Sequence, residues 1–330
     1  MGHYSLKKFR NDSPDSGQIE SIFFLDWSRF VPSPDSSIRQ QLTGVLPPIT
    51  MPFDLNGDLV KGGLREQIDF IVSQGANGVV AGGSTGEGHT LTDAEYASVM
   101  REAYDATAER VPFLAGLIVQ STRSAIERSC LLKGMKVAAL QVTPVHYLFK
   151  PDADATVEHF RTIADATGIP ILIYNVIPWN YLSVDLMLRI MDEVPGVIGM
   201  KQSGGDLKSL SDLLLRCKPE NVVLSGVDAL LYPGFCLGMH GAISALTSAV
   251  PGTVVRIQKA VEANDHKTAR DLHYKLNALW NSLNHDNLPA CVKYIQHLQG
   301  LRMFEPRAPM MRVTEQQKVA IKAALLPLLN

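Results

Sequence analysis

The stretch Val197-Ile198-Gly199-Met200-Lys201-Gln202 is a short apolar run that ends in polar residues, and seven runs of the same kind occur elsewhere in the 330-residue chain. Such runs are typical of strands that are buried on both faces, as in a parallel sheet. Residues near the ends of consecutive runs are 19 to 34 positions apart in the sequence, which leaves room for a helix and two short loops between strands. The eight runs span residues 45–53, 77–84, 111–118, 138–145, 170–176, 197–201, 222–227 and 241–246.

Helical periodicity fills the intervals between the runs. Thr92 with Glu95, and Thr314 with Gln317, have the spacing of a capping box at a helix start. Helical patterns near 251–282, 289–299 and 314–328 follow the last run without a strand between them. Eight strand–helix units with extra helices predict an α/β protein, a (β/α)8 TIM barrel with additional C-terminal helices; a doubly wound open sheet is the alternative.

Composition narrows the function classes. Hydrophobic residues make up 46% of the chain and charged residues 19%, which excludes a disordered or coiled-coil protein. The formal net charge of −2 provides no basic surplus for nucleic acid, and no apolar run is long enough to cross a membrane. Four scattered cysteines without CxxC spacing, and an N-terminus unlike a signal peptide, favour a cytoplasmic protein with buried thiols.

We expect three regions along the chain. Residues 1–42 contain Ser-, Pro- and Asp-rich stretches around one short apolar patch, and they predict an N-terminal extension. Residues 43–250 contain the eight units of the barrel, and residues 251–330 form a C-terminal helical region. In a barrel of this kind the active site lies at the carboxyl ends of the strands.

Two strand ends carry candidate catalytic side chains. Lys201 would project into an apolar centre, where desolvation disfavours the ammonium form and favours the neutral amine that a Schiff base requires. The alternative is a lysine that extends to the barrel rim. Tyr174 ends the preceding run, where its phenol would transfer a proton; the alternative is a core tyrosine bonded to the backbone.

A glycine-rich turn at residues 82–88 offers backbone N–H groups and hydroxyls to an anion. No GK[ST] follows it, so Gly83, Ser84 and Thr85 favour a carboxylate over a nucleotide; a turn without a ligand is the alternative. We expect Glu87 to be a structural carboxylate below the site, with a catalytic role as the alternative. The histidines form no HxH or HExxH pair, so no metal site is predicted.

Taken together, these motifs resemble the dihydrodipicolinate synthase and N-acetylneuraminate lyase family, class I pyruvate-dependent aldolases and lyases. The resemblance extends from about Gly44 to the C-terminus, and it includes Asn287-Leu288-Pro289 followed by Lys293. Its most specific elements are Gly83-Ser84-Thr85-Gly86-Glu87, Thr143-Pro144, Tyr174-Asn175-Val176, Gly199-Met200-Lys201, Ser225-Gly226 and Gly241-Ala242-Ile243-Ser244.

The resemblance implies a site and an assembly. Lys201 would form the Schiff base and Tyr174 would be the acid/base phenol, while Ser84 and Thr85, next to Gly83, would hold the carboxylate of a 2-oxo acid such as pyruvate. The backbone at Ile243 would position Tyr174 or the substrate. Further candidate substrate contacts are Ser203 and His146, with a structural histidine as the alternative for His146. The resemblance also implies an aldehyde-type co-substrate, no metal or organic cofactor, and a homotetramer built as a dimer of dimers.

Three departures from the family pattern bear on the substrate. No arginine follows Tyr174 before Arg189, although dihydrodipicolinate synthases commonly place one there for a second carboxylate. Val145 and His146 stand where those enzymes usually have two tyrosines, so the proton relay must be altered or rerouted. Only one carboxylate, Asp228, follows Gly226, where N-acetylneuraminate lyases tend to have several acidic residues.

The predicted function is therefore a class I aldolase or lyase acting on pyruvate or a longer, hydroxylated 2-oxo acid. It would be of the 4-hydroxy-2-oxoglutarate aldolase or keto-deoxy sugar acid lyase type. Trp179 and Tyr181 would either line a pocket for a less polar aldehyde or pack against the rim of the barrel. The alternatives are 4-hydroxy-tetrahydrodipicolinate synthase, or a dehydratase or deaminase acting through the same imine. A non-enzymatic alternative is a 2-oxo-acid binding or sensor protein.

Overall fold

Eight parallel strands form a single curved sheet in the computed structural model, which describes residues 39, 41–145, 147–283 and 285–329. The strand order is β1-β8-β7-β6-β5-β4-β3-β2, so each strand pairs with its neighbours in the sequence and β1 returns to β8. The strands are β1 Gly44–Val45, β2 Val79–Ala81, β3 Phe113–Leu117, β4 Ala139–Val142, β5 Ile171–Asn175, β6 Val197–Gln202, β7 Val222–Ser225 and β8 Gly241–Ala242.

The chain directly after β1 closes the sheet against β2. Pro48 forms a parallel bridge with Val80, where Ile49 N–H donates to the Val80 carbonyl and Val80 N–H donates to the Pro47 carbonyl, each at 2.9 Å. This closure confirms the (β/α)8 barrel over the open sheet. The predicted strand over 45–53 is wrong in its length, because the prolines in this segment have no N–H to donate to a ladder.

Side chains from alternate strand positions fill the barrel interior, which is a packed apolar core rather than a pore. The interior cluster consists of Leu42, Leu46, Val80, Leu114, Ala139, Leu172, Val222, Leu224 and Ile243, all fully buried. Positions of the opposite parity, such as Leu140 and Val142 on β4, point outward and pack in the larger cluster beneath the helices. Only the ends of the barrel remain available for a polar site.

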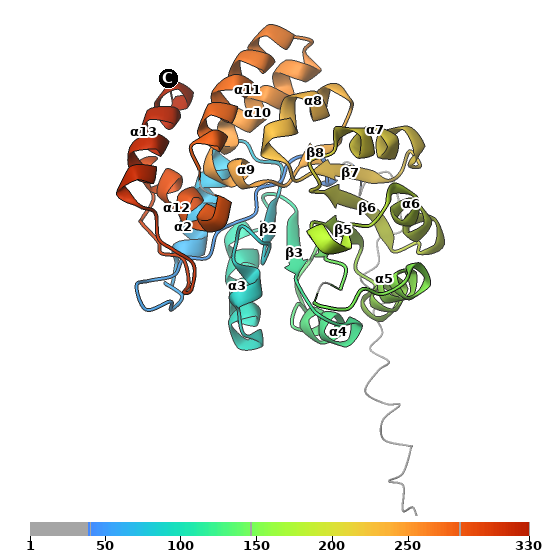
Figure 1. Cartoon of the computed structure of the whole chain (residues 1–330). Coiled ribbons are helices and arrows are strands. Elements are labelled where there is room, and N and C mark those ends of the chain that lie inside the picture. The colour runs from blue at the N-terminus through green and yellow to red at the C-terminus, as the bar shows by residue number, and fades with distance from the viewer. Residues whose placement is uncertain (1–38, 40, 146, 284, 330) are drawn as a thin grey trace, which may run out of the picture.

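Helices surround the barrel in sequence order (Figure 1). Side chains cap several of their N-termini; Thr92 and Glu95 form the predicted capping box, and Asp206 accepts from Lys208 N–H at 2.9 Å. The helices that follow β1 to β8 are α2 Gly63–Ser73, α3 Asp93–Thr107, α4 Thr122–Cys130, α5 Ala153–Thr167, α6 Val184–Glu193, α7 Leu207–Arg216, α8 Leu231–Cys236 and α9 Ala245–Ala249.

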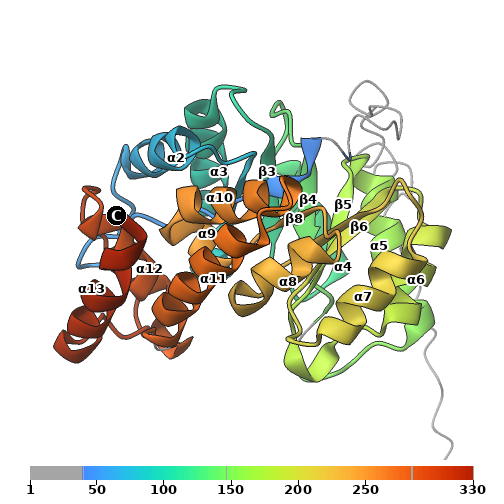
Figure 2. The same cartoon turned by 90° about the horizontal axis from the view of Figure 1, so that it is seen from above.

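Additional helices follow the last strand, as predicted, and α12 and α13 pack against each other at one side of the barrel (Figures 1 and 2). The pattern near 251–282 contains two helices, because Asn264 adopts a left-handed conformation with φ 58° between them. Thr314 and Gln317 form the second predicted capping box. The helices are α10 Pro251–Glu262, α11 His266–Asn281, α12 Leu288–Leu298 and α13 Glu315–Leu329.

Two properties expected from composition can be compared with the described residues. None of the described helices is both long and apolar enough to cross a membrane. Burial of all four thiols is a wrong prediction: Cys291 is buried, but Cys130 and Cys236 are exposed, because they lie at the ends of surface helices α4 and α8. Most of the predicted extension, residues 1–38 and 40, lies outside the described residues.

Candidate active site

Lys201 and Tyr174 lie side by side at the carboxyl ends of β6 and β5. The two residues are register partners in the sheet, and their side chains are only 5% and 4% exposed. The Lys201 Nζ lies 3.9 Å from the centroid of the Tyr174 ring. Both side chains have the strand parity of the interior residues Leu172 and Leu224, so they point into the barrel.

The glycine-rich turn after β2 approaches the same point. Ser84, which is exposed, accepts a hydrogen bond at 3.1 Å from the Tyr174 hydroxyl, so the turn and the β5 phenol are directly connected. Thr85 is half-buried and Gly83 is buried. The structure therefore brings together the predicted residues from β2, β5 and β6, which are far apart in the sequence.

Ser203 also lies next to Lys201, and Gly226 makes this arrangement possible. A Cβ atom on Gly226 would lie 2.2 Å from Ser203 Oγ and 2.7 Å from Lys201 Cε, so only glycine leaves both side chains in place. The buried Ser203 hydroxyl has no hydrogen-bond partner among the described residues. It is therefore available to a molecule bound at Lys201.

Two of the predicted substrate contacts, at Ile243 and His146, stay predictions. Ile243 follows β8, its N–H donates to the Ser225 carbonyl at 2.9 Å, and its side chain belongs to the interior cluster. Its side chain thus packs below the site, and a role for its backbone stays a prediction. His146 lies outside the described residues, so its predicted contact with substrate also stays a prediction.

Asp228 lies in the loop after β7 and is buried. Its two carboxylate oxygens accept from the N–H groups of Leu246 at 2.7 Å and Ala245 at 3.2 Å, at the start of α9. Burial raises the pKa of Asp228 to about 6, although these hydrogen bonds and the nearby Lys201 charge oppose the shift. Both oxygens are thus engaged by the helix N-terminus, where an anionic group is favoured.

Glu87 is a structural carboxylate, in agreement with the expectation. Its side chain forms a fully buried ion pair with Lys293 of α12 and accepts from the Arg307 N–H at 2.8 Å. Lys293 also donates to the Glu305 carbonyl at 2.7 Å. Burial lowers the pKa of Lys293, and the adjacent Glu87 carboxylate opposes that shift. The C-terminal helices thereby hold the base of the glycine-rich turn.

Aromatic residues border the opening of the site. Asn175 fixes the loop after β5 by accepting from Leu182 N–H at 2.9 Å, and Asn180 donates to the Val145 carbonyl at 2.7 Å. Large side chains of the two neighbouring loops are exposed there, namely Tyr147, Leu148, Phe149, Trp179 and Tyr181. The Tyr181 ring lies 3.8 Å from the position that a Gly204 Cβ would occupy.

Arg189 does not serve the site. It lies on α6, where it forms ion pairs with Asp154 and Glu193, each at 2.7 Å. Among the residues that the structure describes, no group of three or more His, Cys, Asp or Glu side chains is arranged to hold a metal ion.

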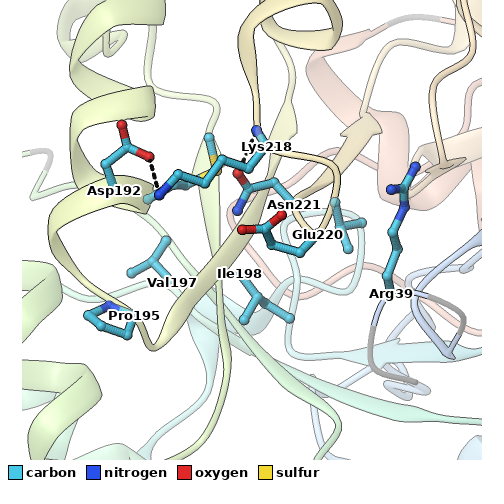
Figure 3. Close-up of a pocket in the computed structure, with 10 residues that line it drawn as sticks. Arg39, Asp192, Pro195, Val197, Ile198, Lys218, Glu220 and Asn221 are labelled. Carbon is cyan, nitrogen blue, oxygen red and sulfur yellow. Dashed lines mark hydrogen bonds and ion pairs between the residues drawn. The ribbon is translucent and has the colours of Figure 1, made fainter. Parts of the chain in front are cut away.

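A separate hollow of about 220 Å³ lies at the amino ends of β6 and β7, at the opposite end of these strands from Lys201 (Figure 3). Lys218, on its wall, forms an ion pair with Asp192 at 2.9 Å. Because barrel enzymes act at the carboxyl ends of their strands, this hollow is not the candidate active site.

Comparison with known proteins places the chain in a family. A model described as the dihydrodipicolinate synthetase family matches residues 41–327. The chain belongs to this family. Relatives named 4-hydroxy-tetrahydrodipicolinate synthase share 34% identity over 291 residues in Bradyrhizobium diazoefficiens and 32% over 289 residues in Methanopyrus kandleri. These alignments cover 87% and 86% of this chain, and 97% and 96% of the relatives.

Solved structures of the dihydrodipicolinate synthetase family superpose on the same region. YagE, a prophage protein of this family from Escherichia coli solved in complex with pyruvate, has a TM-score of 0.82 at 27% identity and covers 87% of this chain and 98% of its own. N-acetylneuraminate lyase from Mycoplasma synoviae has a TM-score of 0.80 at 26% identity, covering 88% and 99%. Membership confirms the predicted family, fold and lyase class.

Gln141 is a polar residue at this end of the barrel that the family motifs do not include. It lies at an inward position of β4, two residues before Thr143, and is 1% exposed. The available signal is a single amide in the middle of the run 138–145, at the strand parity that faces the interior. Its position relative to Gly83 depends on a contact between two strands that are not neighbours in the sheet.

Proposed function

We propose that this protein is a class I aldolase or lyase that forms or cleaves a 2-oxo acid through a Schiff base at Lys201. The observation that carries the proposal is the arrangement of three side chains, one on β5, one on β6 and one in the turn after β2. The Lys201 amine lies 3.9 Å from the Tyr174 ring centroid, and the Tyr174 hydroxyl donates to Ser84 at 3.1 Å. An amine nucleophile, a phenol and a serine hydroxyl thus lie close together. Lysine imine chemistry requires such a combination of a nucleophile and proton-transfer groups.

The first part of the reaction forms the imine. The neutral Lys201 amine attacks the C2 carbonyl carbon, the carbonyl oxygen takes up a proton, and the carbinolamine loses water to give a protonated imine. Tyr174 is placed to supply and remove these protons, with Ser84 as its hydrogen-bond partner. The positive imine nitrogen then serves as the electron sink.

The second part breaks or forms a carbon–carbon bond. In the cleavage direction, the proton of the C4 hydroxyl is removed, the C3–C4 bond breaks, and its electron pair moves into the imine to give an enamine and an aldehyde. Protonation of the enamine at C3 and hydrolysis of the imine release pyruvate and regenerate Lys201. In the synthetic direction the same steps run in reverse, so the proposal includes both.

The remaining predicted residues would bind the substrate. The exposed Ser84 and half-buried Thr85, next to Gly83, offer hydroxyls and backbone N–H groups to the carboxylate. The unpartnered Ser203 hydroxyl lies beside the Lys201 stem, where it would contact the bound intermediate. The backbone at Ile243 and the His146 side chain complete the proposed contacts. The chemistry is carried by the protein's own lysine, so we propose no cofactor or metal.

For the second substrate, we propose a hydroxylated 2-oxo acid or the corresponding aldehyde. The ion pairs of Arg189 with Asp154 and Glu193 support this choice, because the first arginine after Tyr174 is committed to the surface of α6. The second candidate is 4-hydroxy-tetrahydrodipicolinate synthase, which the names of the relatives at 32% and 34% identity favour.

Pyruvate release tests the proposal. Purified full-length protein and Lys201→Ala are supplied with hydroxylated 2-oxo acids, and separately with pyruvate and aldehydes with or without a second carboxylate. We expect turnover by the wild type, none by a folded Lys201→Ala variant, and a preference for aldehydes without the second carboxylate. A preference for the aldehyde that carries its own carboxylate, in addition to that of pyruvate, would identify the synthase instead. Binding without turnover of any substrate would favour a 2-oxo-acid sensor.

The proposal extends to assembly and location. We propose a cytoplasmic homotetramer, a dimer of dimers, in which the exposed aromatic residues around the site opening are covered by a second copy. The exposed fractions of Tyr147, Phe149 and Trp179, 74%, 80% and 65%, support a covered surface there. Light scattering of the full-length chain measures the mass directly.

A further inference from the structure

Gln141 lies inside the barrel, in the layer below Tyr174. Its neighbours in the sheet are Gly116 on β3 and Leu172 on β5, and Leu172 precedes Tyr174 by two residues. Leu140 and Val142 pack outward beneath the helices, whereas Ala139 belongs to the interior cluster, so the alternation directs the Gln141 side chain inward. A primary amide is thus placed within an apolar layer.

Both polar atoms of this amide are left without a hydrogen bond in the part of the chain that the structure describes. Gln141 is 1% exposed, and neither Oε1 nor Nε2 has a hydrogen-bond partner among the described residues. Burying an amide in this state costs folding free energy, and an apolar side chain of the same size would avoid that cost. The arrangement is typical of a group whose partner is a bound molecule, since native sites retain such groups for function.

The direction of the amide indicates which part of a bound molecule it would meet. Gln141 Nε2 lies 3.8 Å from the point where a Cβ atom on Gly83 would stand, so the amide reaches past β3 to the start of the glycine-rich turn. The next residue, Ser84, accepts the Tyr174 hydrogen bond at 3.1 Å. The amide therefore lies next to the start of the turn, one residue away from the serine that bonds the phenol.

We infer that Gln141 is a further substrate-binding residue, whose side-chain N–H donates to the carboxylate of the 2-oxo acid held at Lys201. This inference rests on the proposed function, because it assumes a carboxylate lying over Gly83, Ser84 and Thr85. The amide supplies a donor from below, while the turn supplies donors from the side. Gln141 thereby discriminates 2-oxo acids from ketones that lack the carboxylate, since a carboxylate accepts strong hydrogen bonds.

Gln67 provides a matched comparison within the same protein. It is also a buried glutamine with an unpartnered Nε2, but its Oε1 accepts from Thr50 N–H at 3.0 Å and from the Thr50 hydroxyl at 2.6 Å. Gln67 is thus tied into the protein by its carbonyl, whereas Gln141 is not. Replacing each with methionine removes a buried amide of similar size from two different environments.

The experiment measures imine formation at Lys201 without the second substrate. Full-length wild type, Gln141→Met, Gln141→Glu and Gln67→Met are incubated with increasing pyruvate and sodium borohydride, and the reduced adduct is quantified by intact mass. Hydroxyacetone, a ketone without a carboxylate, is the parallel probe. Thermal unfolding of each unliganded variant is recorded as well.

We expect Gln141→Met to raise the half-saturating pyruvate concentration about ten-fold, the usual effect of losing one hydrogen bond to a charged group, and to leave hydroxyacetone unchanged. Gln141→Glu raises it further as the pH rises and its buried carboxyl ionises, because the carboxylate then repels that of pyruvate. The melting temperature of Gln141→Met stays at or above the wild-type value, whereas Gln67→Met lowers it and leaves pyruvate unaffected.

Two results overturn the inference while leaving the proposed function intact. One is an unchanged half-saturating pyruvate concentration in Gln141→Met, which would show that the amide only holds a buried water. The other is an equal loss with pyruvate and hydroxyacetone, which would show a general distortion of the site. Failure of the wild type to form an adduct with pyruvate or a longer 2-oxo acid would contradict the proposed function itself.

Discussion

At the residue scale, the proposed chemistry depends on the positions of Lys201 and Tyr174. Lys201 and Tyr174 are register partners on β6 and β5, and both are almost fully buried. Gly226 keeps the space beside Lys201 open, because a Cβ there would clash with Lys201 Cε and Ser203 Oγ. The amine is therefore fixed beside the phenol by the strands rather than by a mobile loop.

Replacing Tyr174 with phenylalanine separates imine formation from proton transfer. The ring under Lys201 remains, but the hydroxyl that donates to Ser84 is lost. We expect the turnover number to fall by about 10²- to 10⁴-fold, the usual contribution of a general acid or base. Steady-state pyruvate release measures the effect.

Tyr104→Phe is the matched control, because Tyr104 lies on α3 and packs edge-on against Phe113, far from the site. It should keep wild-type activity. A Tyr174→Phe variant as active as Tyr104→Phe would show that the phenol takes no part in the chemistry.

The sequence predicts those site residues that belong to a local motif, and it does not predict contacts between residues that are far apart in the chain. Lys201, Tyr174 and Ser84 stand at strand ends within specific motifs, so the local pattern is sufficient to predict them. The capping of α9 by Asp228 and the partners of Glu87 depend on residues 17 to 220 positions away, which no local pattern contains. Gln141 lies in no motif, and its relation to Gly83 is likewise a contact between residues far apart in the sequence.

At the element scale, the C-terminal helix α12 supports the turn after β2. Lys293 enters the protein beneath that turn and pairs with Glu87, and both side chains are fully buried. Such a pair contributes little net stability compared with apolar side chains, but removing one partner leaves an uncompensated charge in the interior. The pair therefore couples the position of the turn to the presence of the helix.

We expect Lys293→Met to lower the free energy of unfolding by about 3 to 5 kcal/mol, because it leaves Glu87 unpaired. The double variant Glu87→Gln with Lys293→Met should recover part of this loss, since the buried charge is then also gone. Denaturant unfolding of the single and double variants measures the coupling between the two residues.

Lys267→Met is the surface control, because Lys267 pairs with Asp271 at 3.1 Å on the exposed side of α11. It should cost no more than about 0.5 kcal/mol. If Lys293→Met costs no more than this control, the buried pair has no structural role.

Sequence patterns predict some element boundaries correctly and others incorrectly. Both predicted capping boxes, at Thr92 and Thr314, are present because a cap needs only residues of its own first turn. The strand predicted over 45–53 is reduced to β1 Gly44–Val45, and Pro47 and Pro48 already explain this, because they cannot donate to a neighbouring strand. The exposure of Cys130 and Cys236 depends on which helix faces reach the surface.

At the scale of the whole molecule, regular spacing of strand and helix patterns is sufficient to predict the barrel. Eight units suit closure, and the hydrogen bonds of Pro47 and Ile49 with Val80 complete it. The spacing does not show what lies at each end of the barrel. The hollow at the amino ends of β6 and β7 and the site at Lys201 are distinguished by their chemistry and by the strand direction.

Acid sensitivity of the whole fold is expected from His159 on α5. Its ring is buried against Phe160, and burial lowers the pKa of His159 from 6.5 to about 4. The folded protein favours the neutral ring, so this contribution to stability is complete above pH 6.5 and is lost as the pH falls towards 4. The shift corresponds to about 3 kcal/mol.

We expect His159→Gln to lose about 3 kcal/mol less stability than the wild type between pH 7 and pH 4. Comparing the two proteins is necessary because Asp228, whose pKa burial raises to about 6, acts in the opposite direction. Denaturant unfolding at a series of pH values provides the comparison. Parallel stability curves would contradict the assigned role of His159.

The Schiff-base mechanism is tested by locating the lysine to which pyruvate becomes covalently attached. Full-length protein is incubated with pyruvate and sodium borohydride, digested, and mapped by mass spectrometry, with Lys201→Ala treated in parallel. We expect one reduced pyruvate adduct, located on Lys201, and none in the variant. An adduct on another lysine, or no adduct with pyruvate and with longer 2-oxo acids, would contradict a Schiff-base mechanism at Lys201.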